Sequence, residues 1–337
     1  MKKFLGYIAA AATFSLLAAC GSDDHPPEPP KPVSILATAQ ATPDLSSLVA
    51  AVQFASDNND LVNLLGAAGT LTVFAPTNAA FDKLAVTLTG NKNAKAADIL
   101  VPDNKALVKA VLQYHVLTSV VKAADIPLGK AISPAAGGIF KIELENSRPT
   151  ITDGRNRKSI ITKTDILASN GVVHLIDTVL LPADKTIVAT AGALAGFTSL
   201  SDALKFASND GDLVALLSGT GPFTVFAPTN AAFDALAKEL TGSSTATAKD
   251  ILVPDKKALV RSVLQYHVLA ARVLKADIVP NTAINTALAG KSFTIQASAA
   301  AVTITDGRNR IANIVDTDVL TSNGVIHVID KVILPAL

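Results

Sequence analysis

The side chains best suited to chemistry in this chain are five histidines, a single cysteine and two pairs of closely spaced arginines. An imidazole can act as a general base or bind a metal ion. No two histidines have the i, i+4 spacing of a helical zinc site, and there is no second cysteine. The sequence also has no glycine-rich phosphate loop and no Gly-x-Ser-x-Gly elbow. It therefore predicts no catalytic residue, no metal site and no cofactor.

The arginines lie in two copies of the segment Asp-Gly-Arg-Asn-Arg, as Arg155 and Arg157 and again as Arg308 and Arg310. Asp-Gly favours a hairpin turn, so each copy is predicted to place two cations on an exposed turn. Such a turn can contact acidic glycans or phosphates, or it can be an ordinary solvated hairpin, and the sequence leaves both interpretations open. With 29 basic and 28 acidic residues, the chain has no broad positive field for nucleic acid.

Two Tyr-His pairs, Tyr114-His115 and Tyr266-His267, come at the ends of helical patterns. The pattern that begins at Asp103 has an apolar stripe at helical spacing, formed by Leu107, Val108, Val111 and Leu112. Tyr114 and His115 each come seven residues after a member of that stripe, so they are predicted to face the core and to be structural. His174 alternates with apolar residues in a strand pattern, and a hydrogen-bonded core histidine is favoured over a ligand.

The chain repeats itself over a long interval, because TVFAPTNAAFD occurs at 72–82 and again at 224–234. Other matching segments follow in the same order, and the spacing grows by one residue between the YHVL and DGRNR blocks, which marks a loop. A period near 150 residues matches a whole domain rather than a solenoid repeat. We therefore expect two tandem domains, at 34–182 and 186–335.

One repeat unit begins with helical patterns and ends with strand patterns. The segment LTVFA is a strand stopped by Pro76, after which Thr77 is placed to cap a helix. The last third of the unit alternates apolar and polar residues with period 2. Helices first and strands later predict an α+β fold.

The first residues are typical of export. A short cationic start and an apolar run lead to LAAC, which ends at Cys20. This resembles the lipobox of bacterial lipoproteins, in which the signal, here 1–19, is cleaved and the cysteine is acylated. A cysteine that stands by chance in an ordinary signal peptide is the alternative. The Pro-rich stretch at 20–33 is then a tether. By resemblance to lipoprotein sorting rules, Gly21 and Ser22 favour the outer membrane of a bacterial envelope.

Three motifs together resemble the fasciclin-domain family. They are TVFAPTNAAF, YHVL and SNGVVHLIDTVLLP, and each domain shows all three in this order, the third as SNGVIHVIDKVILP in the second domain. The resemblance implies a wedge of β-strands flanked by helices, and a role in adhesion or matrix interaction. In animal members of the family, the region of the Tyr-His pair is linked to integrin binding. We do not expect such binding here, because these residues are predicted to face the core and bacteria have no integrins.

The expected function is that of a lipid-anchored, non-enzymatic adhesion or surface-interaction protein. Its partners would be the membrane, through the lipid, and an unidentified surface protein or polysaccharide. A protein that binds small ligands or glycans is an alternative, to be distinguished by an apolar pocket with convergent polar groups. A hydrolase would need a nucleophile, a base and an orienting group in one cleft.

Overall fold

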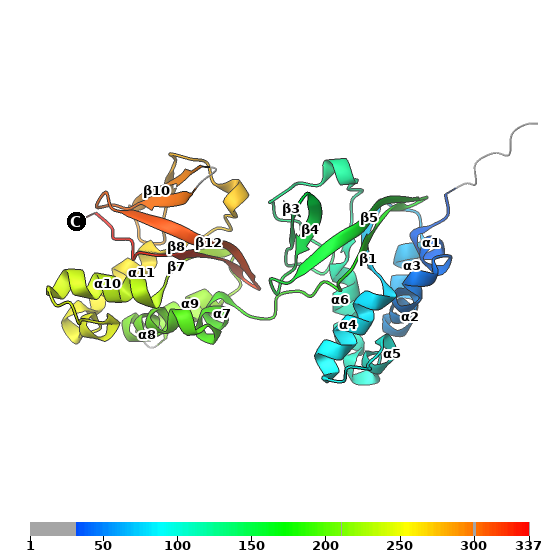
Figure 1. Cartoon of the computed structure of the whole chain (residues 1–337), viewed down its shortest axis with the longest axis horizontal. Helices are drawn as coiled ribbons and strands as arrows, with labels where there is room; N and C mark the ends of the chain where they lie inside the picture. Colours follow the sequence, from blue (N-terminus) through cyan, green and yellow to red (C-terminus); the bar gives the residue numbers. More distant parts are fainter. Residues whose placement is uncertain (1–31, 210, 299–300, 337) are drawn as a thin grey trace, which may run out of the picture. The chain divides into compact units, whose positions relative to one another are not determined.

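The computed structural model describes residues 32–209, 211–298 and 301–336 (Figure 1). By its internal contacts, the segment 32–337 forms one compact unit. The predicted signal at 1–19, the lipidation site Cys20 and nearly all of the tether lie outside the described residues. Within those residues, no single helix is long and apolar enough to cross a membrane. Only a pair, Ile187–Ala193 with Ala195–Ala207, has enough length and apolar character, and it is bent by 108°.

The first domain, which we call domain 1, has helices followed by strands. Its helices are α1 (Ile35–Gln40), α2 (Ser46–Ala55), α3 (Asp60–Gly66), α4 (Asn78–Thr89), α5 (Ala96–Ile99) and α6 (Lys105–Tyr114), with 3-10 turns at Pro43–Leu45, Pro102–Asn104 and Ala123–Asp125. Its strands are β1 (Leu71–Pro76), β2 (Val116–Leu117), β3 (Lys141–Glu145), β4 (Arg148–Thr152), β5 (Lys158–Ala168) and β6 (Gly171–Ile176).

The second domain, domain 2, repeats this order. Its helices are α7 (Ile187–Ala193), α8 (Thr198–Ala207), α9 (Asp212–Ser218), α10 (Asn230–Thr241) and α11 (Lys257–Tyr266), with 3-10 turns at Ala195–Phe197, Ala248–Ile251, Pro254–Lys256 and Lys275–Asp277. Its strands are β7 (Phe223–Pro228), β8 (Val268–Leu269), β9 (Ala283–Asn285), β10 (Ser292–Ala297), β11 (Val302–Thr305), β12 (Ile311–Thr321) and β13 (Gly324–Ile329).

Both sheets are mixed and share one topology. The strand order in domain 1 is β2-β1-β6-β5-β4-β3, and in domain 2 it is β8-β7-β13-β12-β11-β10-β9. The first strand of each domain pairs in parallel with the last, whereas its short neighbour β2 or β8 is antiparallel. Where domain 2 has β9, domain 1 has only an isolated bridge between Ile132 and Phe140. The chain is α+β, as predicted.

The repeated eleven residues form the junction between strand and helix. β1 ends at Pro76, and the side chain of Thr77 caps α4 by accepting a hydrogen bond from the Ala80 N–H. The side chain of Asn78 then accepts from the N–H of Ser47 and donates to Pro43 O, which connects α4 to the start of α2. Thr229 and Asn230 make the equivalent contacts in domain 2. The repeat is therefore explained by structural roles.

Each first strand separates two apolar cores. Side chains alternate across a strand, so Val73 and Ala75 pack with the helices, whereas Phe74 packs with Tyr114 and Phe140 among the strands. Phe74 and Phe140 meet edge to face at 5.3 Å between ring centroids. This arrangement buries every residue of β1 and places the end of α6 between the two cores.

The helix predicted from Asp103 is α6, and it starts at Lys105 after a 3-10 turn. Val111 and Leu112 are buried as predicted, but Leu107 is 48% exposed, so its assignment to a core-facing stripe was wrong. Leu107 instead lines a surface groove, described below.

The two domains are in contact. Lys141 Nζ lies 2.8 Å from Asp318 Oδ2, and the two side chains are only 6% and 1% exposed. Burial alone lowers the pKa of Lys141, but the hydrogen bond and charge of Asp318 raise it above its ordinary value. Asn156 adds a reciprocal pair of hydrogen bonds with the main chain of Leu320.

Candidate functional site

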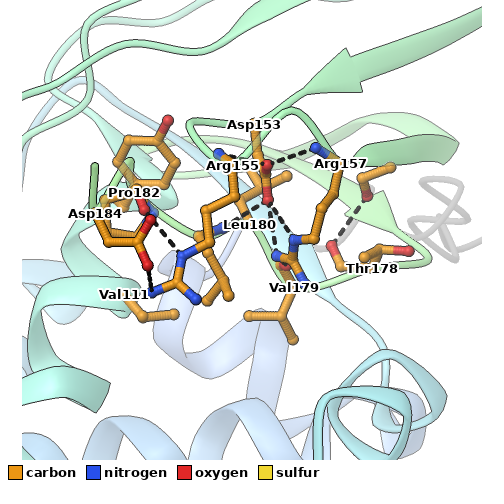
Figure 2. Close-up of polar contacts among 12 residues, drawn as sticks. Val111, Asp153, Arg155, Arg157, Thr178, Val179, Leu180, Pro182 and Asp184 are labelled. Carbon is orange, nitrogen blue, oxygen red and sulfur yellow. Dashed lines mark hydrogen bonds and ion pairs between the residues drawn. The ribbon is translucent and has the colours of Figure 1, made fainter. Parts of the chain in front are cut away.

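The Asp-Gly-Arg-Asn-Arg turn of domain 1 is built around a buried carboxylate, Asp153, which is 1% exposed (Figure 2). One oxygen accepts from the N–H groups of Arg155 and Arg157, each at 2.9 Å. The other accepts from the Arg157 guanidinium at 2.7 and 3.0 Å and from the Leu181 N–H at 2.9 Å. Asp153 thus connects the turn to a segment 28 residues further along the chain.

Hydrogen bonds and ion pairs hold the side chains of both arginines of this turn against the protein. Arg157 also donates to Val179 O at 2.6 Å, so its Nε and one terminal nitrogen are both bonded to the fold. Arg155 points the other way, where it forms a 3.2 Å ion pair with Asp184 and donates to Pro182 O (Figure 2). Both arginine side chains are about one-third exposed, at 33% and 31%, but Arg157 is paired with the buried Asp153 and so is not a free cation.

Domain 2 repeats this arrangement. Asp306 accepts from the N–H groups of Arg308, Arg310 and Leu334 and from the Arg310 side chain. Burial raises the pKa of Asp306, but these hydrogen bonds outweigh burial and hold it below its ordinary value. Arg310, with a side chain only 19% exposed, pairs with Glu239 as well and is not a free cation. Arg308 donates to Pro335 O at 3.2 Å.

The Tyr-His pairs are buried in both domains. His115 is 1% exposed, with Nδ1 2.7 Å from Val111 O and Nε2 accepting from the Leu180 N–H at 2.9 Å. Desolvation lowers its pKa to about 4, so the ring is neutral at pH 7. Tyr114 donates to Ile139 O, and burial raises the pKa of its phenol. Tyr266 and His267 are held in the same way.

The strand histidines also have main-chain hydrogen-bond partners, and His327 Nδ1 lies 3.9 Å from the carboxylate of the buried Asp318. His174 Nε2 is 2.9 Å from Val121 O, and its Nδ1 accepts from the Asp165 N–H at 3.3 Å. His327 makes the same two contacts with Val273 and Asp318, and burial lowers its pKa. Among the described residues, no group of three or more His, Cys, Asp and Glu side chains could hold a metal ion.

A feature that the sequence reasoning did not identify is an apolar groove beside the arginine turn, present in both domains. In domain 1 it lies between α4 and α6 and is lined by Phe81, Leu84, Leu88, Ile99, Leu100, Asn104, Leu107, Val108, Val111, Leu112, Arg155, Leu181 and Pro182. In domain 2 it is lined by Phe233, Leu236, Leu240, Ile251, Leu252, Lys256, Leu259, Val260, Val263, Leu264, Arg308, Val332 and Leu334. The available signal was the apolar stripe of Leu107, Val108, Val111 and Leu112, all of which line this groove.

Several known proteins are similar in sequence to this chain. The chain is 38% identical over 154 residues to Protein sll1483 of Synechocystis sp., an alignment that spans 45% of this chain and 74% of that protein. It is 28% identical to human periostin over 88% of this chain, and 29% identical to the transforming growth factor-beta-induced protein ig-h3 of Sus scrofa over 79%. These alignments span only 30% of periostin and 35% of ig-h3.

Among solved structures, a FAS1 domain pair from the insect cell adhesion molecule Fasciclin I aligns with 86% of this chain and 97% of that chain, at 20% identity and a TM-score of 0.42. The sequence model of the family described as Fasciclin domain matches residues 43–182 and 195–335, which together make up most of the chain. Both matches contain the strand–proline–helix junction, the Tyr-His pair and the Asp-Gly-Arg-Asn-Arg turn. The chain belongs to the fasciclin-domain family, with two domains in tandem.

Proposed function

We propose that this chain is a non-enzymatic adhesion or surface-interaction protein, held on a bacterial envelope by a lipid at Cys20. Adhesion and matrix interaction are the roles that membership of the fasciclin family leads us to expect. One observation favours this over hydrolysis. Both ring nitrogens of each histidine in the two domains are within hydrogen-bond distance of main-chain groups, so none is poised as a base.

The anchor rests on the sequence around Cys20, which lies outside the described residues. Two or more acyl chains hold a protein stably on a membrane, because each buried methylene contributes about 0.8 kcal/mol. Cells grown with an alkyne analogue of palmitate should label the wild-type chain but not Cys20→Ser, and the variant should move from the membrane to the soluble fraction. An unlabelled wild-type chain would exclude the lipid anchor, and with it the outer-membrane location expected from Gly21 and Ser22.

Adhesion is tested in the producing bacterium. A strain that lacks the chain should attach less to its own matrix or to neighbouring cells, and the full chain should restore attachment. Cys20→Ser should not restore it, because the released protein cannot connect a cell to its surroundings. Purified residues 32–337, which form one compact unit, should compete with attachment of the wild-type strain. Undiminished attachment of the strain that lacks the chain would contradict the proposal.

A small-ligand function remains the second candidate, and one observation favours it. The apolar groove of domain 2 has Lys256 and Arg308 among its lining residues, which is the combination of apolar walls and a few polar groups expected of ligand sites.

A further inference from the structure

The groove of domain 2 is a half-open apolar trough on the protein surface. Its floor includes Phe233 and Leu264, which are 4% and 6% exposed. Its rims include Leu240 on α10 and Leu259 on α11, which are 43% and 45% exposed. Single exposed leucines are ordinary, but two that face one trough above a buried apolar floor provide a continuous surface for an apolar partner.

Two cationic side chains, Lys256 and Arg308, line this trough. Arg308 uses Nε to bond Pro335 O, which leaves its terminal nitrogens free of that contact. Within residues 32–209, 211–298 and 301–336, no carboxylate lies within 4 Å of either cation. An apolar surface beside two cations that form no ion pair with any described residue is complementary to a molecule with an apolar tail and an anionic head.

The equivalent groove of domain 1 has the same leucines but lacks this charge. Asn104 stands in the place of Lys256 and donates its amide to Ile99 O at 3.0 Å. Arg155 is neutralised by Asp184 at 3.2 Å, and the sequence counterpart of Asp184 in domain 2 is Leu337. The enclosed volume is also smaller, about 60 Å³ against about 120 Å³. The two grooves thus differ in charge and size but not in apolar character.

We propose that the groove of domain 2 binds a free fatty acid, with its carboxylate at Lys256 and Arg308 and its chain along Leu240 and Leu259. The volume of about 120 Å³ is slightly below the ~150 Å³ of an engineered apolar cavity that accepts benzene. The enclosed part therefore holds the end of one acyl chain, and the half-exposed leucines cover the rest. This activity is separate from adhesion and does not depend on it.

The test is calorimetric titration of residues 32–337 with decanoate below its micelle concentration. One decanoate per chain is expected to bind. Lys256→Asn, which introduces the residue of domain 1, should weaken binding by about tenfold, as loss of a charged hydrogen bond does. Decan-1-ol should bind about tenfold more weakly than decanoate and should be insensitive to Lys256→Asn.

Leu259→Asp should abolish binding, whereas the matched change in the groove of domain 1, Leu107→Asp, should leave it unchanged. Both leucines are nearly half exposed, so both variants should fold, which far-UV circular dichroism and thermal unfolding check. Absence of binding heat, or equal binding by wild type, Leu259→Asp and Lys256→Asn, would overturn the proposal. So would a chain that dimerises through this face, shown by light scattering in which Leu259→Asp alone yields a monomer and decanoate has no effect.

Discussion

The Nε2 atom of His115 accepts a 2.9 Å hydrogen bond from the main-chain N–H of Leu180, which lies 65 residues further along the chain. Through Nδ1, the same ring contacts Val111 O in its own helix. The imidazole thus connects the end of α6 to the segment that leaves β6. Because the equivalent ring of His267 bonds Ile333 in the same way, this connection is a property of both domains.

His115→Ala should destabilise the protein. The change leaves a cavity and two buried main-chain groups without partners, at a combined cost of roughly 2–5 kcal/mol. Urea unfolding of residues 32–337 measures the loss, with the exposed Lys92→Ala as the control that should change little. A variant of wild-type stability that no longer competes with attachment would instead make His115 part of a recognition surface.

Stability should fall as the pH drops from about 6.5 to about 4. Desolvation lowers the pKa of His115 and of His267 from 6.5 to about 4, so in this window the unfolded chain binds protons that the folded chain does not. Each histidine contributes up to about 1.4 kcal/mol per pH unit. Above 6.5 the contribution is complete and the dependence disappears.

The pH dependence is checked by urea midpoints measured between pH 4 and 8. His115→Gln combined with His267→Gln should reduce the slope below pH 6.5, whatever its effect on absolute stability, and leave the part due to His327, whose pKa burial also lowers. The Lys92→Ala control should retain the wild-type slope. An equally steep slope in the double variant would mean that other groups carry the dependence.

The two arginines of one turn should differ in their contribution to stability. Arg157→Ser removes two hydrogen bonds to the buried Asp153 and should cost roughly 1.5–3 kcal/mol. Arg155→Ser removes a surface ion pair and should cost less than about 1 kcal/mol. Thermal unfolding of the two variants separates them, and similar losses would contradict the assignment.

Attachment assays that concern an anionic partner should therefore use Arg155 and Arg308, because changes at Arg157 and Arg310 also disturb the fold.

The contact between the domains depends on a buried charge. Lys141→Met leaves Asp318 without its cation and should cost about 3–5 kcal/mol. Adding Asp318→Asn should recover part of this loss, because the uncompensated charge is removed. Lys130→Met is the matched control, since it removes a half-exposed pair with Asp277 at the same contact and should cost less than about 1 kcal/mol. Equal losses for Lys141→Met and Lys130→Met would show that the buried pair has no special role.

Much of the fold was predictable because its signals are local. The proline stop and the capping threonine act within a few residues, so the junction at Pro76 and Thr77 could be placed from the sequence. The added residue between the YHVL and DGRNR blocks was correctly taken to mark a loop. The structure narrows that loop to the connection between β9 and β10, since the bridge of Ile132 with Phe140 corresponds to Ile284 with Phe293.

By itself, the sequence determined the duplication, the α+β class and the place of each Tyr-His pair at the end of a helix, since these depend on neighbours along the chain. Tertiary structure decided what those residues contact. Arg157 resembles an exposed cation until Asp153 is found buried beside it, held by the N–H of Leu181. Leu107 resembles a core residue until it is found nearly half exposed in a surface groove. Both outcomes depend on groups distant in sequence, whose positions are set by packing of the whole domain and not by local propensity.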